Sequence, residues 1–341
     1  CRTFPTLRVW NRTSWSNSTR RKTNHPQNTR EGGLETGRPF AFWANVGTPG
    51  KSGARLRFQT GANLSDTPSI EDVRAATIVE PKKAKSFTLE GSATRGDELF
   101  GSKKEAKASL DADALAINDL QDALFACKGG SLLVVLQGID TAGKDGTTKE
   151  CFKYTSPLGV HVHAFGKPTE IELAHDYLWR IHQVAPRKGH IAVFNRSQYE
   201  DVLVVKVRNL APPKLIEQRY EQINAFEKIL AENGTRILKI MLNISKDEQG
   251  VRLRERLEVP AKRWKFNASD LEDRKLWDQY QIAYEGMLQR CSTAHAPWHV
   301  IPADSRSRRD AIAARLIRGE LEAMKPAYPD PGYRLEQFEI D

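Results

Sequence analysis

An apolar run followed at once by a glycine-rich loop is the feature that most limits the fold of this 341-residue chain. Residues 132–136 read Leu-Leu-Val-Val-Leu, and residues 138–144 read Gly-Ile-Asp-Thr-Ala-Gly-Lys. The loop matches G-x-x-x-x-G-K, in which backbone N–H groups and the next helix N-terminus surround a phosphate while the lysine adds a positive charge. Because a strand-like run precedes it and helix-forming sequence follows it, the pattern predicts a P-loop.

The loop departs from the common motif at one position. Asp145 stands where a Ser or Thr usually holds Mg²⁺, so the metal ligand must lie elsewhere. We expect Asp140, inside the loop, to coordinate Mg²⁺ or to orient an attacking phosphate. The alternative is a tight glycine turn between charged surface residues. The residues expected to bind phosphate here are Gly138, Thr141, Ala142, Gly143, Lys144, Asp145, Gly146 and Thr147.

Strand and helix patterns alternate along most of the chain. The expected strands cover residues 131–137, 160–165, 190–194, 235–244 and 298–301. The expected helices run from Lys103 to a stop at Gly129 and Gly130, over 170–184, over 213–232, from a Ser245 cap, over 269–291 and over 308–324. This alternation predicts an α/β fold with a parallel sheet covered by helices on both faces.

A second polar group follows the expected strand 190–194. Asn195 and Arg196 stand where P-loop proteins carry an acidic metal-binding residue. Asn195 offers Mg²⁺ a carbonyl oxygen but no charge, so Asp140 or the acids just downstream would supply it. Arg196 suits bidentate phosphate binding, and the alternative is a surface cation at a strand end. The candidate metal ligands are Asp140, Asn195 and Glu200.

A basic segment over about residues 250–268 forms the third group. It carries arginines into a break at Pro260, followed by Lys-Arg-Trp-Lys. Such a segment is typical of a lid that closes over phosphates and excludes water. The alternative is a solvated helix face, and a single Trp is a weak platform for stacking nucleic acid. The candidate lid and nucleotide-binding residues are Arg252, Arg256, Lys262 and Lys265.

The net charge of +9 is concentrated at the start of the chain. Residues 1–60 hold 11 Lys and Arg against Glu31 and Glu35, so the remainder is formally neutral. Residues 1–85 sustain no period of 2 or 3.6, and we expect a disordered basic leader. Because the chain begins with Cys rather than Met, we interpret the leader as a fragment or a non-native segment. The functional alternative is a nucleic-acid-binding arm.

Two other classes of protein are disfavoured by the sequence. The four cysteines form no CxxC pair and no Cys/His cluster, which argues against a zinc site and a disulfide framework. The longest apolar runs are far shorter than the ~20 residues that a membrane span needs. We therefore expect a soluble, cytoplasmic protein.

The motifs together resemble those of the polyphosphate kinase 2 family. The resemblance covers about residues 86–325 and rests on seven blocks in the family's order. They are Leu-Gln-Gly-Ile-Asp-Thr-Ala-Gly-Lys-Asp-Gly-Thr at 136–147, His-Asp-Tyr-Leu-Trp-Arg at 175–180, Phe-Asn-Arg-Ser-Gln-Tyr-Glu-Asp-Val-Leu-Val-Val at 194–205, Ile-Asn-Ala-Phe-Glu at 223–227, Ile-Ser-Lys-Asp-Glu-Gln at 244–249, Arg-Trp-Lys-Phe at 263–266 and Ala-Pro-Trp-His-Val-Ile-Pro-Ala-Asp at 296–304.

The resemblance implies a three-layer α/β/α P-loop kinase fold, similar to thymidylate kinase, with a helical lid at about 250–268. It further implies a phosphotransferase domain over 86–327 and a C-terminal tail over 328–341. The implied activity is reversible phosphoryl transfer between inorganic polyphosphate and AMP or ADP, giving ADP or ATP, with GMP and GDP as further candidates. Mg²⁺, or alternatively Mn²⁺, is the implied cofactor, and a homo-oligomer is the implied assembly.

The resemblance also assigns roles to residues. Lys144 and Arg196 would bind the phosphate chain, Asp140 would position the acceptor phosphate and the metal, and the basic segment would close as the lid. We expect the polyphosphate end to lie along Lys144, Arg196 and Lys206. Two positions depart from the family: many relatives have Asp at Asn195, and the Lys that commonly follows the strand phenylalanine is displaced to Lys167.

Two rival functions remain open at the level of sequence. One is an ATP-dependent small-molecule kinase, which would need ATP as the donor and would ignore polyphosphate. The other is an RNA-binding P-loop protein with a basic arm, although a role in nucleic-acid binding is disfavoured by the neutral remainder of the chain. RNA binding would be salt-sensitive and would be lost on deleting residues 1–60, without turnover.

Overall fold

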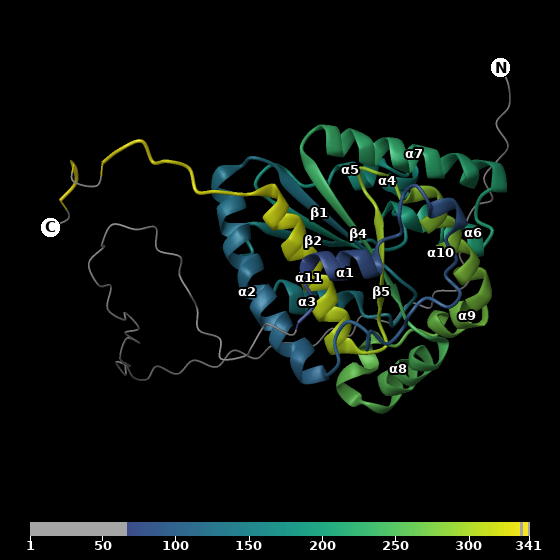
Figure 1. Cartoon of the computed structure of the whole chain (residues 1–341). Helices are drawn as coiled ribbons and strands as arrows, with labels where there is room; N and C mark the ends of the chain where they lie inside the picture. The colour runs from purple at the N-terminus through teal and green to yellow at the C-terminus, as the bar shows by residue number, and fades with distance from the viewer. Residues whose placement is uncertain (1–66, 335–336, 340–341) are drawn as a thin grey trace, which may run out of the picture. The chain divides into compact units, whose positions relative to one another are not determined.

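The computed structural model describes residues 67–334 and 337–339, which form a parallel sheet between two layers of helices (Figure 1). The strands are β1 (Ser131–Gln137), β2 (Val160–Ala164), β3 (Ile191–Asn195), β4 (Thr235–Asn243) and β5 (Trp298–Pro302). Within the described residues the sheet has five strands in the order β2-β3-β1-β4-β5, and every pairing is parallel. The predicted three-layer α/β/α fold is confirmed.

The helices divide between the two faces of the sheet. Those of the described chain are α1 (Ile70–Thr77), α2 (Lys103–Cys127), α3 (Lys144–Cys151), α4 (Glu170–Leu173), α5 (Trp179–His182), α6 (Val204–Val207), α7 (Pro213–Glu232), α8 (Lys246–Glu258), α9 (Ser269–Lys275), α10 (Trp277–Cys291) and α11 (Arg306–Met324), with short 3₁₀ turns η3 (Ala84–Ser86), η4 (Gln198–Asp201) and η5 (Pro260–Lys265). Helices α1, α2, α3 and α11 pack together on one face, and α6, α7 and α10 on the other.

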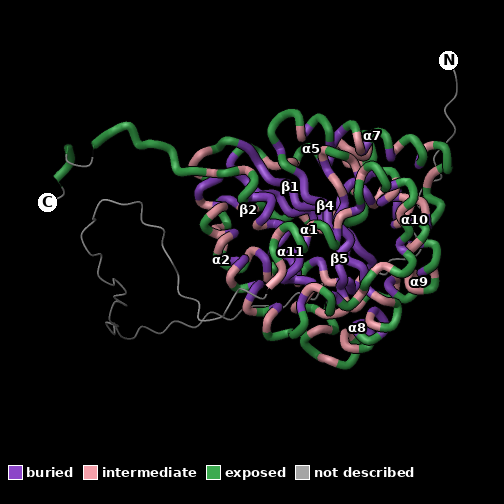
Figure 2. Tube along the Cα trace, viewed as in Figure 1, coloured by how far each residue is buried: buried purple, intermediate pink, exposed green. Residues whose placement is uncertain are grey.

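Strand β1 lies at the centre of the sheet and fixes where the functional loops meet. All of its residues are buried, and Figure 2 shows the buried strands between exposed helix surfaces. Leu136 pairs with Asn195 of β3 and with Ile240 of β4. Since parallel strands end at the same edge of a sheet, the segments after β1, β3 and β4 emerge side by side.

Two of the expected helices are each broken in two. The predicted helix 170–184 is divided into α4 and α5, because Asp176 Oδ1 accepts from the N–H groups of Leu178 (3.0 Å) and Trp179 (3.1 Å) and so caps a new turn. The expected Thr169 capping box is confirmed at the start of α4. The predicted helix 269–291 is divided at Leu276, which ends α9 and precedes α10. The remaining helices agree with the prediction to within a few residues.

The expectation of disorder up to residue 85 is wrong for residues 67–85, whereas residues 1–66 lie outside the described part of the chain. Helix α1 begins with a capping box between Ser69 and Asp72. Its Arg74 pairs with Glu320 of α11 (2.6 Å), and the N–H of Val79 donates to the carbonyl of Trp298 (2.8 Å). A helix of eight residues is too short to show a clear period, so the sequence alone does not predict its packing on α11 and β5.

His299 of β5 should make the stability of this docked segment depend on pH. It is buried, and its Nδ1 lies 2.9 Å from Thr77 Oγ1 of α1. Burial, assisted by Arg74, lowers the pKa of His299 to about 4. A histidine with a lowered folded-state pKa contributes its full stability above its unfolded pKa and loses it as the pH falls through the folded value.

As the pH falls from about 6.5 to about 4, the titration of His299 should lower the free energy of unfolding by about 3 kcal/mol. Urea unfolding at a series of pH values measures this change. The His299→Gln variant, which cannot titrate in this range, should lose less stability over the same interval. Equal pH dependence of the two proteins would contradict the assignment.

Among residues 67–334 and 337–339, none of the helices combines the length with the apolar composition that a membrane-spanning helix requires.

Candidate active site

The loop after β1 has the backbone of a phosphate-binding turn. Gly138 has φ +151°, and a Cβ there would lie 2.9 Å from the carbonyl oxygen of Leu242. Gly143 has φ +114° at the N-terminus of α3, and a Cβ there would overlap the Arg309 guanidinium. Both positions therefore require glycine. Thr141 is also left-handed (φ +71°), and its buried hydroxyl has no partner among the described residues.

Lys144 folds back over the loop from the first position of α3. Its Nζ donates to the carbonyl of Gly138 (2.6 Å), and the side chain is largely buried. Burial and the nearby Arg196 lower the pKa of Lys144, whereas Asp140, Glu200 and Asp145 act against that shift. The lysine thus provides a positive charge inside the turn, as the motif predicts.

Arg196 and Asp140 form an ion pair beside this lysine. Arg196 follows β3 with φ +64°, and its backbone N–H donates to Leu136 of β1 (3.0 Å). Burial alone would raise the pKa of Asp140, but Lys144 and Arg196 outweigh it, and the pKa is lowered. Burial raises the pKa of the neighbouring Glu200 despite Arg196 and Lys144. The structure therefore brings the three predicted catalytic residues and Glu200 together.

The candidate metal ligands do not form a closed cage. Within the described residues there is no cluster of three or more His, Cys, Asp or Glu side chains suited to a metal ion. Asn195 Nδ2 donates to Asp145 Oδ1 (2.7 Å), which leaves the Asn195 carbonyl oxygen for another partner. Asp140, Asn195 and Glu200 are all oxygen donors. Mg²⁺ commonly binds one or two carboxylates together with water and substrate phosphates, so this donor set fits it.

Three of the four predicted lid residues, Arg256, Lys262 and Lys265, are each paired with a carboxylate. Arg256 Nη1 donates to Asp270 (2.8 Å), Lys265 Nζ donates to Asp145 (3.2 Å), and Lys262 donates to Glu255. Burial and the charge of Asp140 raise the pKa of Asp270 to about 6, against the effect of Arg256. The predicted lid is thus α8 followed by η5, and its charges lie within reach of the loop.

Arg252, a predicted nucleotide-binding residue, has a different position. It is buried, and its Nε donates to Glu248 (2.8 Å). Its Nη1 donates to the carbonyls of Thr141 and Ala142, and its Nη2 donates to those of Ala303 and Asp304, all at 2.7 to 3.0 Å. Because every N–H of the guanidinium donates to an acceptor of the protein, Arg252 has no donor left to bind a nucleotide in this structure. It holds the loop and the end of β5 against α8.

Replacing Arg252 with lysine should therefore lower stability by about 2–4 kcal/mol, because several buried carbonyls lose their donors. Arg254→Lys is the matched control, since Arg254 is exposed on the same helix. Urea unfolding of both variants measures the difference. A change in the KM for nucleotide without a loss of stability in Arg252→Lys would instead support the original prediction.

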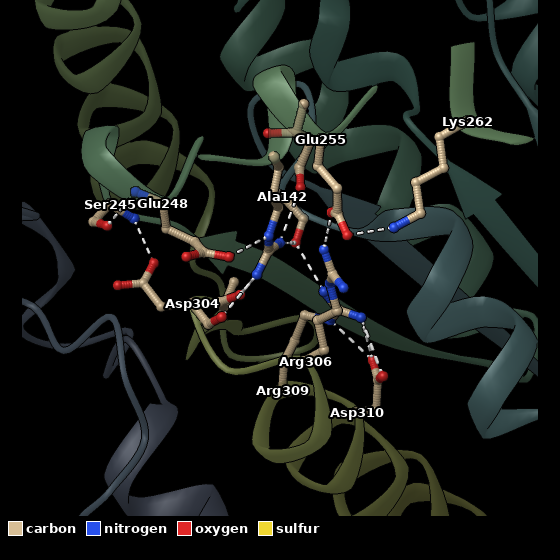
Figure 3. A network of polar contacts seen from close by, with 12 residues as sticks. Ala142, Ser245, Glu248, Glu255, Lys262, Asp304, Arg306, Arg309 and Asp310 are labelled. Carbon is tan, nitrogen blue, oxygen red and sulfur yellow. Dashed lines mark hydrogen bonds and ion pairs between the residues drawn. The ribbon is translucent and has the colours of Figure 1, made fainter. Parts of the chain in front are cut away.

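Helix α11 contacts the phosphate-binding loop and the start of α3 and holds them in place. The sequence did not predict these contacts. Arg309 Nη1 donates to the carbonyl of Ala142 (3.2 Å), and Asp310 Oδ1 accepts from Thr147 Oγ1 (2.8 Å) and from Arg309 Nε (2.9 Å). Figure 3 shows Arg309 between Ala142 and Asp310, with Glu255 between Lys262 and Arg306. Thr147 also donates its N–H to the carbonyl of Gly143 (3.0 Å), so both of its donors are used within the protein, and a role for Thr147 in phosphate binding stays a prediction.

Lys206 lies in a different setting from the other predicted phosphate ligands. Its Nζ is 6.0 Å from the ring centroid of Tyr220, and burial together with Arg290 lowers the pKa of Lys206. Among the described residues it has no ion pair with a carboxylate. A place for Lys206 along a phosphate chain stays a prediction.

The chain thus presents a glycine loop between a central parallel strand and a helix, with cations converging on it from β3 and from a basic segment. Fold and site together define a P-loop phosphotransferase. Comparison with known proteins makes the assignment more specific. The sequence model of the polyphosphate kinase 2 (PPK2) family matches residues 101–329, and the chain belongs to this family.

Individual relatives support the same family assignment. An AMP/ADP-polyphosphate phosphotransferase of Meiothermus ruber is 49% identical over 241 residues, which are 71% of this chain and 90% of the relative. An ADP-polyphosphate phosphotransferase of Rhodopseudomonas palustris is 37% identical over 261 residues, covering 72% of this chain and 90% of the relative. The crystal structure of polyphosphate kinase 2 from Arthrobacter aurescens TC1 superposes with a TM-score of 0.75 at 38% identity, covering 80% of this chain and 95% of that one.

Proposed function

We propose that this protein transfers phosphoryl groups between inorganic polyphosphate and AMP or ADP. The observation that carries the proposal is the cluster of Asp140, Lys144 and Arg196 at the carboxyl edge of the sheet, within reach of the lid cations. Relatives that act on polyphosphate and adenine nucleotides share most of the chain. This favours polyphosphate transfer over an ATP-dependent small-molecule kinase and over an RNA-binding protein.

In the forward direction a terminal phosphate oxygen of ADP attacks the end phosphorus of polyphosphate. The new P–O bond forms as the bond to the rest of the chain breaks, and the shortened polyphosphate leaves with its charge. The attacking oxygen is already an anion, so the step needs no general base. Lys144 and Arg196 bind the phosphates, and Asp140 orients the acceptor and Arg196.

Asp140, with Asn195 or Glu200, would hold Mg²⁺ together with the substrate phosphates. When bound, Mg²⁺ would offset the repulsion between two like-charged phosphate groups. Closure of α8 and η5 over the site would exclude water, so that the phosphoryl group passes to the nucleotide rather than to hydrolysis. Mn²⁺ is the alternative cation, and a cytoplasmic location and a homo-oligomeric assembly complete the proposal.

The test supplies the purified protein with polyphosphate, Mg²⁺ and either ADP or AMP, and follows ATP and ADP by chromatography. We expect product that requires both polyphosphate and the divalent cation. Absence of product, or product that forms without polyphosphate, would refute the proposal. Single-turnover comparison of AMP, ADP, GMP and GDP in the same assay would establish acceptor preference.

A further inference from the structure

A buried ion pair lies behind the site and has no part in the mechanism above. Lys239 of β4 and Glu227 of α7 are both fully buried, and Lys239 Nζ lies 2.6 Å from Glu227 Oε2. Removing two charges from water is costly, and apolar residues of similar size often serve stability as well or better. The pair therefore calls for an explanation beyond stability.

The hydrogen bonds of this pair converge on one segment of the site. Glu227 Oε1 accepts from Gln198 Nε2 (3.0 Å) and from the Tyr199 hydroxyl (2.7 Å). Lys239 Nζ donates to that same hydroxyl (2.8 Å) and to the carbonyl of Cys291 (2.6 Å). Gln198 and Tyr199 both belong to η4, the short turn that follows Arg196 and includes Glu200.

This turn needs outside support. Arg196 has φ +64°, a conformation that an arginine rarely adopts and that persists only where the surroundings impose it. The turn η4 spans four residues, which is too short to be rigid by itself. Its cap is the Ser197 hydroxyl, which accepts from the N–H of Tyr199 at 3.3 Å. The other side-chain hydrogen bonds of Gln198 and Tyr199 go to the buried charges. The Tyr199 ring also packs edge-on against Trp298, and Arg219 holds Asp201 at the end of the turn (3.1 Å).

We propose that Glu227 and Lys239 are positioning residues, which hold Gln198 and Tyr199 so that Arg196 and Glu200 keep their places at the phosphate site. This inference rests on the proposed function, because it gives a role to residues beside that site. It assigns the anchoring to the acceptor oxygen of Glu227, and to Lys239 the task of orienting that carboxylate.

Two double variants separate anchoring from folding. Glu227→Gln with Lys239→Met removes both charges and keeps an acceptor oxygen for Gln198 and Tyr199. Glu227→Leu with Lys239→Met removes both charges and that acceptor. Both leave the Cys291 carbonyl without its donor, so they are matched in that loss. We expect the first to keep its kcat within about threefold of the unaltered protein, and the second to lose about 30-fold, since small misplacements are costly.

The KM for nucleotide, which binds under the lid, should change little in either variant, and tripolyphosphate binding measured by calorimetry should weaken about tenfold in the leucine variant alone. Equal kcat and equal tripolyphosphate affinity in the two double variants would overturn the inference.

If either double variant fails to fold, the single variant Gln198→Met replaces it. The change removes the buried hydrogen bond from Gln198 Nε2 to Glu227 (3.0 Å) but keeps the size of the side chain and both buried charges, so it should lower the melting temperature only moderately. It should lower kcat about fivefold, and an unchanged kcat would also overturn the inference.

If the proposed function itself is wrong, the result differs from the one that would overturn this inference. If the unaltered protein makes no ATP from ADP and polyphosphate, the activity proposal fails by itself. The tripolyphosphate affinities of the same variants then still decide whether the buried pair positions the phosphate site.

Discussion

Lys144→Met should lower kcat/KM for transfer from polyphosphate to ADP by about 10³-fold, with little change in the melting temperature. The lysine carries the positive charge inside the loop, and its ammonium bonds the Gly138 carbonyl (2.6 Å). Methionine keeps the apolar stem that packs in this buried position, so the loss should fall on charge stabilisation rather than on folding. Initial rates of ATP formation, with thermal unfolding in parallel, measure both effects.

Lys149→Met is the matched control, because Lys149 lies on the same short helix but is exposed. It should keep the activity of the unaltered protein. Equal activity of the two methionine variants would exclude Lys144 from phosphate binding and with it the proposed reaction at this loop.

Asp140→Asn should lower kcat by about 10²- to 10³-fold, because the change removes both a carboxylate for the metal and the partner of Arg196. The asparagine is nearly the same size, so the backbone of the loop should persist. The Mg²⁺ concentration that gives half-maximal rate should rise in the same variant. Rates measured over a series of Mg²⁺ concentrations separate this rise from the loss at saturation.

Asp145→Asn provides the comparison, since Asp145 is exposed and pairs with Asn195 and Lys265 instead. We expect a loss of about tenfold or less, because one exposed ion pair to the lid contributes little. A larger loss in Asp145→Asn than in Asp140→Asn would move the metal-binding role from the loop interior to the start of α3.

The sequence was sufficient to predict the features that depend on local backbone conformation. The glycines at 138 and 143 permit a turn that other residues cannot adopt, and this turn constrains the chain wherever it occurs. Strand β1 is read from an uninterrupted apolar run, because a central parallel strand is buried on both faces. Parallel order then brings the ends of β1 and β3 together, and with them Asp140 and Arg196, although their ion pair was not among the predictions.

The arginines of α8 show where such reasoning stops. Helical spacing puts Arg252 and Arg256 on one face and Arg254 on the opposite face, which is correct. It cannot tell that Arg252 lies beneath the loop while Arg256 reaches Asp270, because that depends on how α8 packs against β5. Helix α11 carries no motif, so the support that Arg309 gives to the loop could not be inferred before the fold was known.

The pairing of Arg256, Lys262 and Lys265 with carboxylates has a consequence for how a polyanion would enter. These three cations are already paired with carboxylates of the same chain, so binding at them would be an exchange of counter-ions rather than a simple gain of attraction. Each phosphate that takes one of these cations would displace Asp270, Glu255 or Asp145 into solvent. A single phosphate would gain little by such an exchange, whereas a chain of linked phosphates could make several exchanges while losing its freedom of motion once.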